Sequence, residues 1–177
     1  QFGVYLPFAE ELDRLCLAAP ACAVALGMNS GPGPRIMDFG ALGRALPLIC
    51  YEAVFAHELR QVQTRPDFLL QITNDAWFGT WSGPFQHLRQ AQMRAIEQGL
   101  PMIRVANTGV SAMIDPYGRI IGQIPLGTAG YVDLPLPQPL KPTFYTVWGD
   151  IPSISLPIAV LFYLLLVPSF AKRRNND

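Results

Sequence analysis

The sequence has few cysteines and little charge, and both shortages exclude classes of function. Only 15% of its 177 residues are charged and the formal net charge is zero, so no basic surface for nucleic acid is indicated. The three cysteines, Cys16, Cys22 and Cys50, form neither a CxxC motif nor a cluster with histidine at metal-ligand spacing. Cys16 and Cys22 either pair or lie as small buried residues. We therefore expect no metal, no other cofactor and no nucleic-acid partner.

Charge is absent altogether from residues 151–171, and the basic residues Lys172, Arg173 and Arg174 follow directly. A bilayer is crossed by about 20 apolar residues, so this run predicts a transmembrane helix, with a buried core helix as the alternative. Basic residues next to a membrane segment favour the cytoplasmic side. We therefore expect a cytoplasmic C-terminus and a preceding domain on the periplasmic side of a bacterial inner membrane.

The beginning of the sequence does not look like a signal peptide, because Gln1, Phe2 and Gly3 open neither a charged segment nor an apolar one. A domain outside the cytoplasm needs an export signal, so we expect this chain to be the C-terminal part of a longer protein. We divide it into a domain at residues 1–133, a Pro-rich linker at 134–150, the transmembrane helix at 151–171 and a basic tail at 172–177.

Hydrophobic periodicity predicts strands that alternate with helices. The expected strands are residues 45–50, 68–73 and 102–106, a hairpin of 109–114 with 119–124, and a short strand at 131–134. The expected helices are residues 10–18, 52–63 and 85–98, the last of them ended by Gly99 and Pro101. Such an alternation is typical of an α/β layer fold, and the hairpin makes the sheet mixed rather than purely parallel.

The strand at residues 45–50 ends in Cys50, and Tyr51 and Glu52 open the next helix. A nucleophile at such a strand-to-helix turn is exposed, and backbone N–H groups point at the reacting atom. A helix N-terminus also favours the thiolate, so Cys50 is well placed for covalent catalysis. The alternative is a buried structural cysteine at a strand end.

Motifs around Cys50 resemble a known family. LICYE at residues 48–52 resembles the nucleophile motif of the carbon–nitrogen hydrolase (nitrilase) superfamily. NDAWFG at 74–79, QHLRQAQMRAIE at 86–97 and RVANTGVSAMIDPYG at 104–118 resemble one branch of it, the apolipoprotein N-acyltransferases. The resemblance implies the C-terminal part of an α-β-β-α sandwich in an inner-membrane enzyme. The implied reaction moves an acyl chain from a phospholipid to the α-amine of the diacylglyceryl-cysteine of an apolipoprotein.

By this resemblance Cys50 attacks the phospholipid ester and carries the acyl chain as a thioester, with Tyr51 and Glu52 in supporting roles. Glu52 would orient the site through hydrogen bonds at the helix start. The alternative for Glu52 is an ordinary acid in a first helical turn, favoured there by the helix dipole.

The family triad also contains a glutamate base and a lysine that stabilises the tetrahedral intermediate. The only lysines of this sequence, Lys141 and Lys172, follow Cys50, whereas the family lysine precedes the cysteine. Val4 stands where the family commonly has a second glutamate. We therefore expect the triad lysine and glutamate upstream of Gln1, and we expect the chain alone to be inactive.

The NDAWFG segment supplies the expected substrate contacts, which are Asn74, Asp75, Trp77 and Phe78. It follows a strand and is expected to line the face that carries Cys50. Its aromatic rings suit acyl chains or a membrane surface, and the alternative is an aromatic cluster under a loop.

Three other functions compete with acyl transfer. A Cys–His protease would need a histidine beside Cys50, but His57 lies about 10 Å further along the expected helix axis. His87 begins another helix, and neither histidine has an evident orienting partner in the sequence. An amidase of the same superfamily would use water as the acceptor. A membrane-anchored domain that only binds lipid or lipoprotein would need no chemistry.

Overall fold

The computed structural model describes residues 33–174. The helix expected at residues 10–18 lies outside the described residues, as do Val4, Cys16 and Cys22. The chain divides into two units, Gln1–Lys141 and Pro142–Asp177, and each is described by itself.

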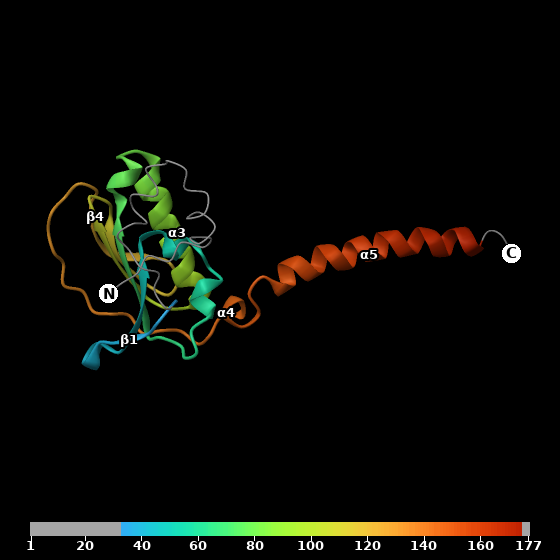
Figure 1. Ribbon diagram of the computed structural model, residues 1–177, viewed down its shortest axis with the longest axis horizontal. Helices are drawn as coiled ribbons and strands as arrows, with labels where there is room; N and C mark the ends of the chain where they lie inside the picture. The colour runs from blue at the N-terminus through green and yellow to red at the C-terminus, as the bar shows by residue number, and fades with distance from the viewer. Residues whose placement is uncertain (1–32, 175–177) are drawn as a thin grey trace, which may run out of the picture. The chain divides into compact units, whose positions relative to one another are not determined.

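The first unit is built on a six-stranded mixed sheet whose spatial order follows the sequence (Figure 1). The strands are β1 (Met37–Asp38), β2 (Arg44–Ile49), β3 (Phe68–Asn74), β4 (Met102–Asn107), β5 (Ser111–Ile114) and β6 (Ile120–Ile124). Strands β2, β3 and β4 pair in parallel, whereas β1, β5 and β6 join antiparallel. The predicted α/β class with a mixed sheet is confirmed, as are the three predicted main strands and the hairpin.

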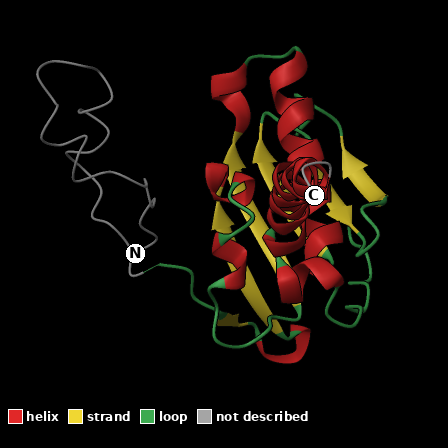
Figure 2. Ribbon diagram, turned by 90° about the vertical axis from the view of Figure 1, so that its right-hand side faces the viewer, coloured by secondary structure: helices red, strands yellow, loops and turns green. Residues whose placement is uncertain are grey.

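One face of the sheet packs against helix α3 (Ser82–Gln98), which is seen among the red helices of Figure 2. The core between them is apolar: Leu46, Leu48, Leu69, Met102 and Ile114 from the strands and Leu88, Ala91 and Ala95 from α3 are all buried. Alternation along the strands places these side chains on the same face of the sheet. The small residues Ala91 and Ala95 on α3 are fully buried and let the helix pack close to the sheet.

The predicted helix at residues 85–98 is confirmed, with its start three residues earlier at Ser82. It ends at Gly99, whose φ of 60° and ψ of 35° lie in the left-handed region, and the Gly99 N–H donates to the carbonyls of Ala95 and Ile96. A glycine is favoured in this conformation because it has no Cβ. The predicted C-terminal cap is therefore confirmed.

The prediction of one continuous helix at residues 52–63 is wrong. The structure has two short 3-10 helices instead, η2 (Cys50–Val54) and η3 (Glu58–Arg60). The carbonyl of Val54 accepts a hydrogen bond of 2.8 Å from Arg94 on α3. In an α-helix that carbonyl would accept from the Glu58 N–H. Here the Glu58 N–H donates instead to the Phe55 carbonyl at 3.2 Å. A tertiary contact therefore takes the carbonyl that a continuous helix would use.

The prediction of a strand at residues 131–134 is also wrong, because residues 128–140 have no regular secondary structure and do not join the sheet. Pro135 and Pro137 lack the N–H that a ladder needs. The segment is tied instead to the end of α3, where the Leu140 N–H donates to Gly99 at 2.9 Å. Arg65 adds hydrogen bonds of 2.6 Å to the carbonyls of Leu140 and Gln98.

The second unit consists of helices α4 (Phe144–Trp148) and α5 (Ile151–Arg174). Helix α5 covers the charge-free run of the sequence, so a helix does lie where one was predicted. Within the residues that the structure describes, however, no helix has both the length and the apolar character that crossing a bilayer requires. The described residues therefore give no support to the predicted transmembrane span at residues 151–171, which stays a prediction.

Candidate active site

Three parallel strands end at the same edge of the sheet, and Cys50 follows the first of them. In the sheet register Ile49 pairs with Ile72, and Asn74 pairs with Asn107. The carboxyl ends of parallel strands are the usual place for ligands in α/β sheets. The structure thus brings Cys50 to the edge where β3 and β4 also end.

Cys50 has a left-handed backbone with a φ of 50° and a partly exposed side chain. A positive φ is uncommon outside glycine, and strained residues of this kind gather at functional sites. The same sharp turn exposes the nucleophile in enzymes that place it between a strand and a helix. Such a backbone is consistent with the predicted nucleophile, and the role of Cys50 stays a prediction.

Both residues after Cys50 contact its turn. The Ile49 N–H donates to Glu52 Oε2 at 2.6 Å, which closes the turn around the cysteine. Tyr51 is half exposed, and its ring lies 5.9 Å from the ring of Phe55 and 6.2 Å from that of His87. Glu52 thus makes the predicted hydrogen bond at the helix start, and its part in the chemistry stays a prediction.

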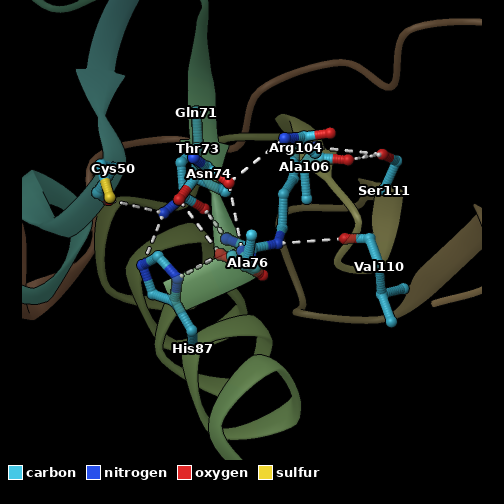
Figure 3. Close-up of polar contacts among 12 residues, drawn as sticks. Cys50, Gln71, Thr73, Asn74, Ala76, His87, Arg104, Ala106, Val110 and Ser111 are labelled. Carbon is cyan, nitrogen blue, oxygen red and sulfur yellow. Dashed lines mark hydrogen bonds and ion pairs between the residues drawn. The ribbon is translucent and has the colours of Figure 1, made fainter. Parts of the chain in front are cut away.

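A buried polar network lies behind Cys50 (Figure 3). Gln71 of β3 donates from Nε2 to the carbonyl oxygen of Cys50 at 3.1 Å, and the same nitrogen lies 3.1 Å from His87 Nε2. Arg104 of β4 donates to Gln71 Oε1 at 2.5 Å and to Asp75 Oδ2 at 2.5 Å. His87 Nδ1 lies 2.9 Å from Asp75 Oδ1. Four side chains from β3, β4, η4 (Asp75–Phe78) and α3 therefore converge on the turn at Cys50.

The donors and acceptors of this network determine its proton positions. Arginine can only donate, so the atom of Gln71 that faces Arg104 is its oxygen. The amide nitrogen of Gln71 then faces Cys50 and His87 as a donor, and His87 Nε2 must accept. His87 is therefore a neutral imidazole with its proton on Nδ1, where it donates to Asp75.

Asp75 is the charged centre of the network and is completely buried. Burial by itself raises the pKa of a carboxyl, but the hydrogen bond from His87 and the charge of Arg104 outweigh it and hold the pKa of Asp75 below its ordinary value. Burial lowers the pKa of Arg104, while the charge of Asp75 and, to a smaller extent, the charge of Cys50 act to raise it. The positive charge of Arg104 is thus within electrostatic reach of the thiol.

The residues expected to contact substrate divide into two groups. Asp75 is buried and saturated by its partners, and Asn74 caps the next turn by accepting from the Ala76 N–H at 3.1 Å. Trp77 is 80% exposed, and Phe78, at 37%, packs its ring 5.4 Å from that of His87. Asn74, Trp77 and Phe78 are therefore exposed to solvent, and Asp75 alone of the four predicted contacts is buried.

Sequence reasoning missed Gln71 and found no orienting partner for His87, which in fact pairs with Asp75. The available signal was polar residues at alternate positions of strands β3 and β4, on the face that carries the core. In the part of the chain that is described, no group of three or more His, Cys, Asp or Glu residues is arranged to hold a metal ion.

Comparison with known proteins agrees with this fold. The carbon–nitrogen hydrolase family matches residues 27–138. The chain is 45% identical to the apolipoprotein N-acyltransferase of Rhodopseudomonas palustris over 165 residues, which are 93% of this chain and 31% of that protein. It is 42% identical to the apolipoprotein N-acyltransferase of Bradyrhizobium diazoefficiens over 172 residues, which are 97% of this chain and 32% of that protein.

The chain thus spans about a third of the length of these curated relatives. Among solved structures it is similar to Nit3 of Saccharomyces cerevisiae, a member of the nitrilase superfamily. The TM-score is 0.50 and the identity is 18%, over 59% of this chain and 41% of Nit3. That similarity concerns the fold. From the family match over most of its length, together with the turn at Cys50, the chain belongs to the carbon–nitrogen hydrolase family.

Proposed function

We propose that this chain is the nucleophile-bearing part of an N-acyltransferase that acylates apolipoproteins, with Cys50 as the nucleophile. The observation that carries the proposal is the left-handed, partly exposed Cys50 at the end of a parallel strand. The identity of 45% to an apolipoprotein N-acyltransferase supports acyl transfer as the reaction. The proposed donor is a phospholipid, and the proposed acceptor is the α-amine of a diacylglyceryl-cysteine.

The proposed reaction has two steps that return the enzyme to its starting state. The Sγ atom of Cys50, as thiolate, attacks the ester carbonyl of the phospholipid. The tetrahedral intermediate expels the glycerol oxygen, which takes a proton and leaves as a lysophospholipid. The acceptor amine then attacks the thioester, loses a proton and forms the amide, and the thiol of Cys50 is regenerated. The general base and the lysine of the family triad are placed upstream of Gln1 in this proposal.

The turn at Cys50 supplies one donor for the intermediate. In a strand-to-helix turn the backbone N–H that follows the nucleophile faces the developing oxyanion, and here that group belongs to Tyr51. Such donors stabilise the charge that appears only in the transition state. In this proposal Glu52 supports the turn through its hydrogen bond to Ile49.

The exposed aromatic residues after β3 form the proposed acyl-chain contact. Trp77 and Trp81 are 80% and 88% exposed, and Phe78 packs beside His87 in the network that holds Cys50. In this proposal the aromatic rings contact the chain, and Asn74 and Asp75 maintain the shape of the segment that carries them.

We also place the protein at a membrane surface, through α5. Apolar side chains around the whole described part of this helix are exposed, among them Ile154, Leu156, Leu161, Phe162 and Leu165. A helix that is apolar on all sides is buried in some apolar environment. Flotation of residues 142–177 with phospholipid vesicles tests this assignment, and recovery of the segment only in the lipid-free fraction would contradict it.

The proposed activity is tested with the protein expressed from its complete reading frame and held in detergent. A phospholipid with a labelled acyl chain is supplied with a diacylglyceryl-cysteine peptide, and the products are separated by mass. Labelled amide on the peptide, abolished by Cys50→Ala, is the expected result. Labelled free fatty acid in its place would identify a hydrolase. Binding of lipid without either product would indicate a domain that only binds.

A further inference from the structure

We propose that Gln71 is a positioning residue for Cys50. Its side-chain amide holds the carbonyl of Cys50 toward the protein interior and thereby directs the Tyr51 N–H toward the reacting carbonyl. The inference rests on the proposed function of Cys50 as the nucleophile, and it names the side chain that fixes the turn at Cys50.

Gln71 fixes the orientation of the peptide plane between Cys50 and Tyr51. Gln71 is completely buried on β3, and its Nε2 donates to the Cys50 carbonyl at 3.1 Å. In a trans peptide the C=O and the following N–H point in opposite directions. Because Gln71 fixes the carbonyl on the buried side, the Tyr51 N–H is fixed on the opposite side, where an oxyanion donor is required.

The left-handed backbone of Cys50 makes such a restraint necessary. A φ of 50° is unfavourable for a residue with a Cβ, so the turn persists only where the surroundings hold it. Glu52 restrains the turn from the strand side through the Ile49 N–H at 2.6 Å. Gln71 restrains it from the core side, so the strained residue is held at the Cys50–Tyr51 peptide and, one residue before it, at the Leu48–Ile49 peptide.

Gln71 can do this because its own orientation is fixed. Arg104 donates to Gln71 Oε1, and His87 accepts from Nε2, so a rotated amide would place donor against donor and acceptor against acceptor (Figure 3). Asp75 holds both Arg104 and His87. The buried carboxylate of Asp75 thus fixes Arg104 and His87, these two fix the amide of Gln71, and Gln71 fixes the carbonyl of Cys50.

The chemistry suggests a test that separates positioning from mere stability. Acylation of Cys50 by an ester develops an oxyanion and needs the Tyr51 N–H, whereas alkylation by iodoacetamide needs only the thiolate. A variant that loses the restraint should therefore slow acylation much more than alkylation. A general loss of structure would change both rates together.

The experiment uses the protein expressed from its complete reading frame, with Gln71→Glu and Gln71→Met. Glutamate keeps the shape and the bond from Arg104 but cannot donate to Cys50, and methionine removes the amide without adding charge. The matched control is Gln92→Met: Gln92 is a buried glutamine on α3 that donates to the Gly118 carbonyl at 2.5 Å, at the hairpin turn. Rates of acylation by labelled phospholipid and of alkylation are measured for each, with the melting temperature.

We expect both Gln71 variants to acylate about 10-fold to 100-fold more slowly, as for a misplaced catalytic donor, with KM and alkylation changed less than about threefold. We expect Gln92→Met to lower the melting temperature while it acylates at the unmodified rate. Equal slowing of acylation and alkylation, or no slowing in a folded Gln71 variant, would overturn the inference. Failure of the unmodified protein to be acylated at Cys50 would contradict the proposed function itself.

Discussion

At the scale of single residues, one buried carboxylate organises the polar groups behind Cys50. Asp75 accepts from Thr73 at 3.1 Å and pairs with His87 and Arg104. Gly109 packs so closely against it that a Cβ at that position would overlap the carboxylate. A glycine is therefore required there by close approach rather than by its backbone angles.

The buried pair of Asp75 with Arg104 should matter far more than the exposed pair of Asp67 with Arg44. Asp75→Asn leaves a buried guanidinium without its counter-charge and should destabilise the fold by about 3–5 kcal/mol. Asp67→Asn removes a pair whose side chains are 42% and 48% exposed, and such pairs contribute about 0–1 kcal/mol. Denaturant midpoints of the two variants measure the difference. Equal losses would show that Asp75 is not the electrostatic centre of the network.

Asp115 should make stability depend on pH in the acid range. Burial raises the pKa of its carboxyl, but hydrogen bonds from Arg119 and Tyr117 outweigh it and lower the pKa overall. A carboxyl with a lowered folded-state pKa contributes stability that is fully present above its unfolded pKa of about 3.9 and is lost as pH falls through the folded value.

Asp115→Asn should therefore cost about 1–2 kcal/mol at pH 7, and the difference from the unmodified protein should shrink below about pH 4. Melting curves of both proteins between pH 7 and pH 3 measure this. A difference that stays constant over the whole range would contradict a lowered pKa.

The sequence predicts Cys50 as the nucleophile but does not indicate which residues hold its turn, because those residues lie far away along the chain. Cys50 is marked by its place after an apolar strand and by the LICYE motif. Its restraint comes from Gln71, and the orientation of Gln71 comes from Arg104, which is 33 positions further on. Polar residues buried in strands look alike in a sequence whether they serve a site or not. Only the strand register and the direction of the side chains show which of them reach the turn at Cys50.

At the scale of elements, prediction succeeded where local chemistry decides and failed where tertiary contacts do. Helix α3 ends at Gly99 because a glycine favours the left-handed cap, which is a local property. The helix expected after Cys50 is broken because Arg94 takes the Val54 carbonyl from 40 positions away. In place of the strand expected at residues 131–134, the chain has no regular secondary structure and is held at Leu140 by Arg65 and Gly99.

Arg65 should hold the segment around Leu140 against the end of helix α3. Arg65→Met loses the hydrogen bonds to Leu140, Gln98 and Gly99, so local opening near Lys141 should become about tenfold more frequent, which corresponds to about 1.4 kcal/mol. The rate of cleavage at the Leu140–Lys141 bond by a protease that cuts on the amino side of lysine, with the product identified by mass, measures this opening. Arg89→Met, which removes a hydrogen bond to Gln92 on α3, is the matched control. Equal cleavage of both variants would contradict the role of Arg65 in holding the segment near Leu140.

At the scale of the whole molecule, the sheet has one covered face and one partly open face. Gln71 and Thr73 point into the core, so Ile72 between them lies on the opposite face, beside Val105 in the register of β3 and β4. These two side chains are 44% and 49% exposed. Exposed apolar surface of this kind on a sheet favours association.

Residues 1–150 produced alone should therefore associate. Light scattering behind a sizing column should show aggregates, and Ile72→Thr with Val105→Thr should reduce them, because threonine keeps a good propensity for strands while lowering apolar exposure. A monodisperse monomer that melts cooperatively without these substitutions would refute the prediction.

The central claim is that Cys50 forms a thioester with an acyl chain taken from a phospholipid. The most direct measurement is peptide mass spectrometry on the protein from its complete reading frame, mixed with an isotopically labelled phospholipid and quenched in acid before any acceptor is added. We predict one labelled acyl group on the peptide that contains Cys50, removed by neutral hydroxylamine, absent in Cys50→Ala and retained in Cys16→Ser and Cys22→Ser. An acyl adduct that persists in Cys50→Ala, or no adduct on a folded protein that binds the phospholipid, would contradict the account.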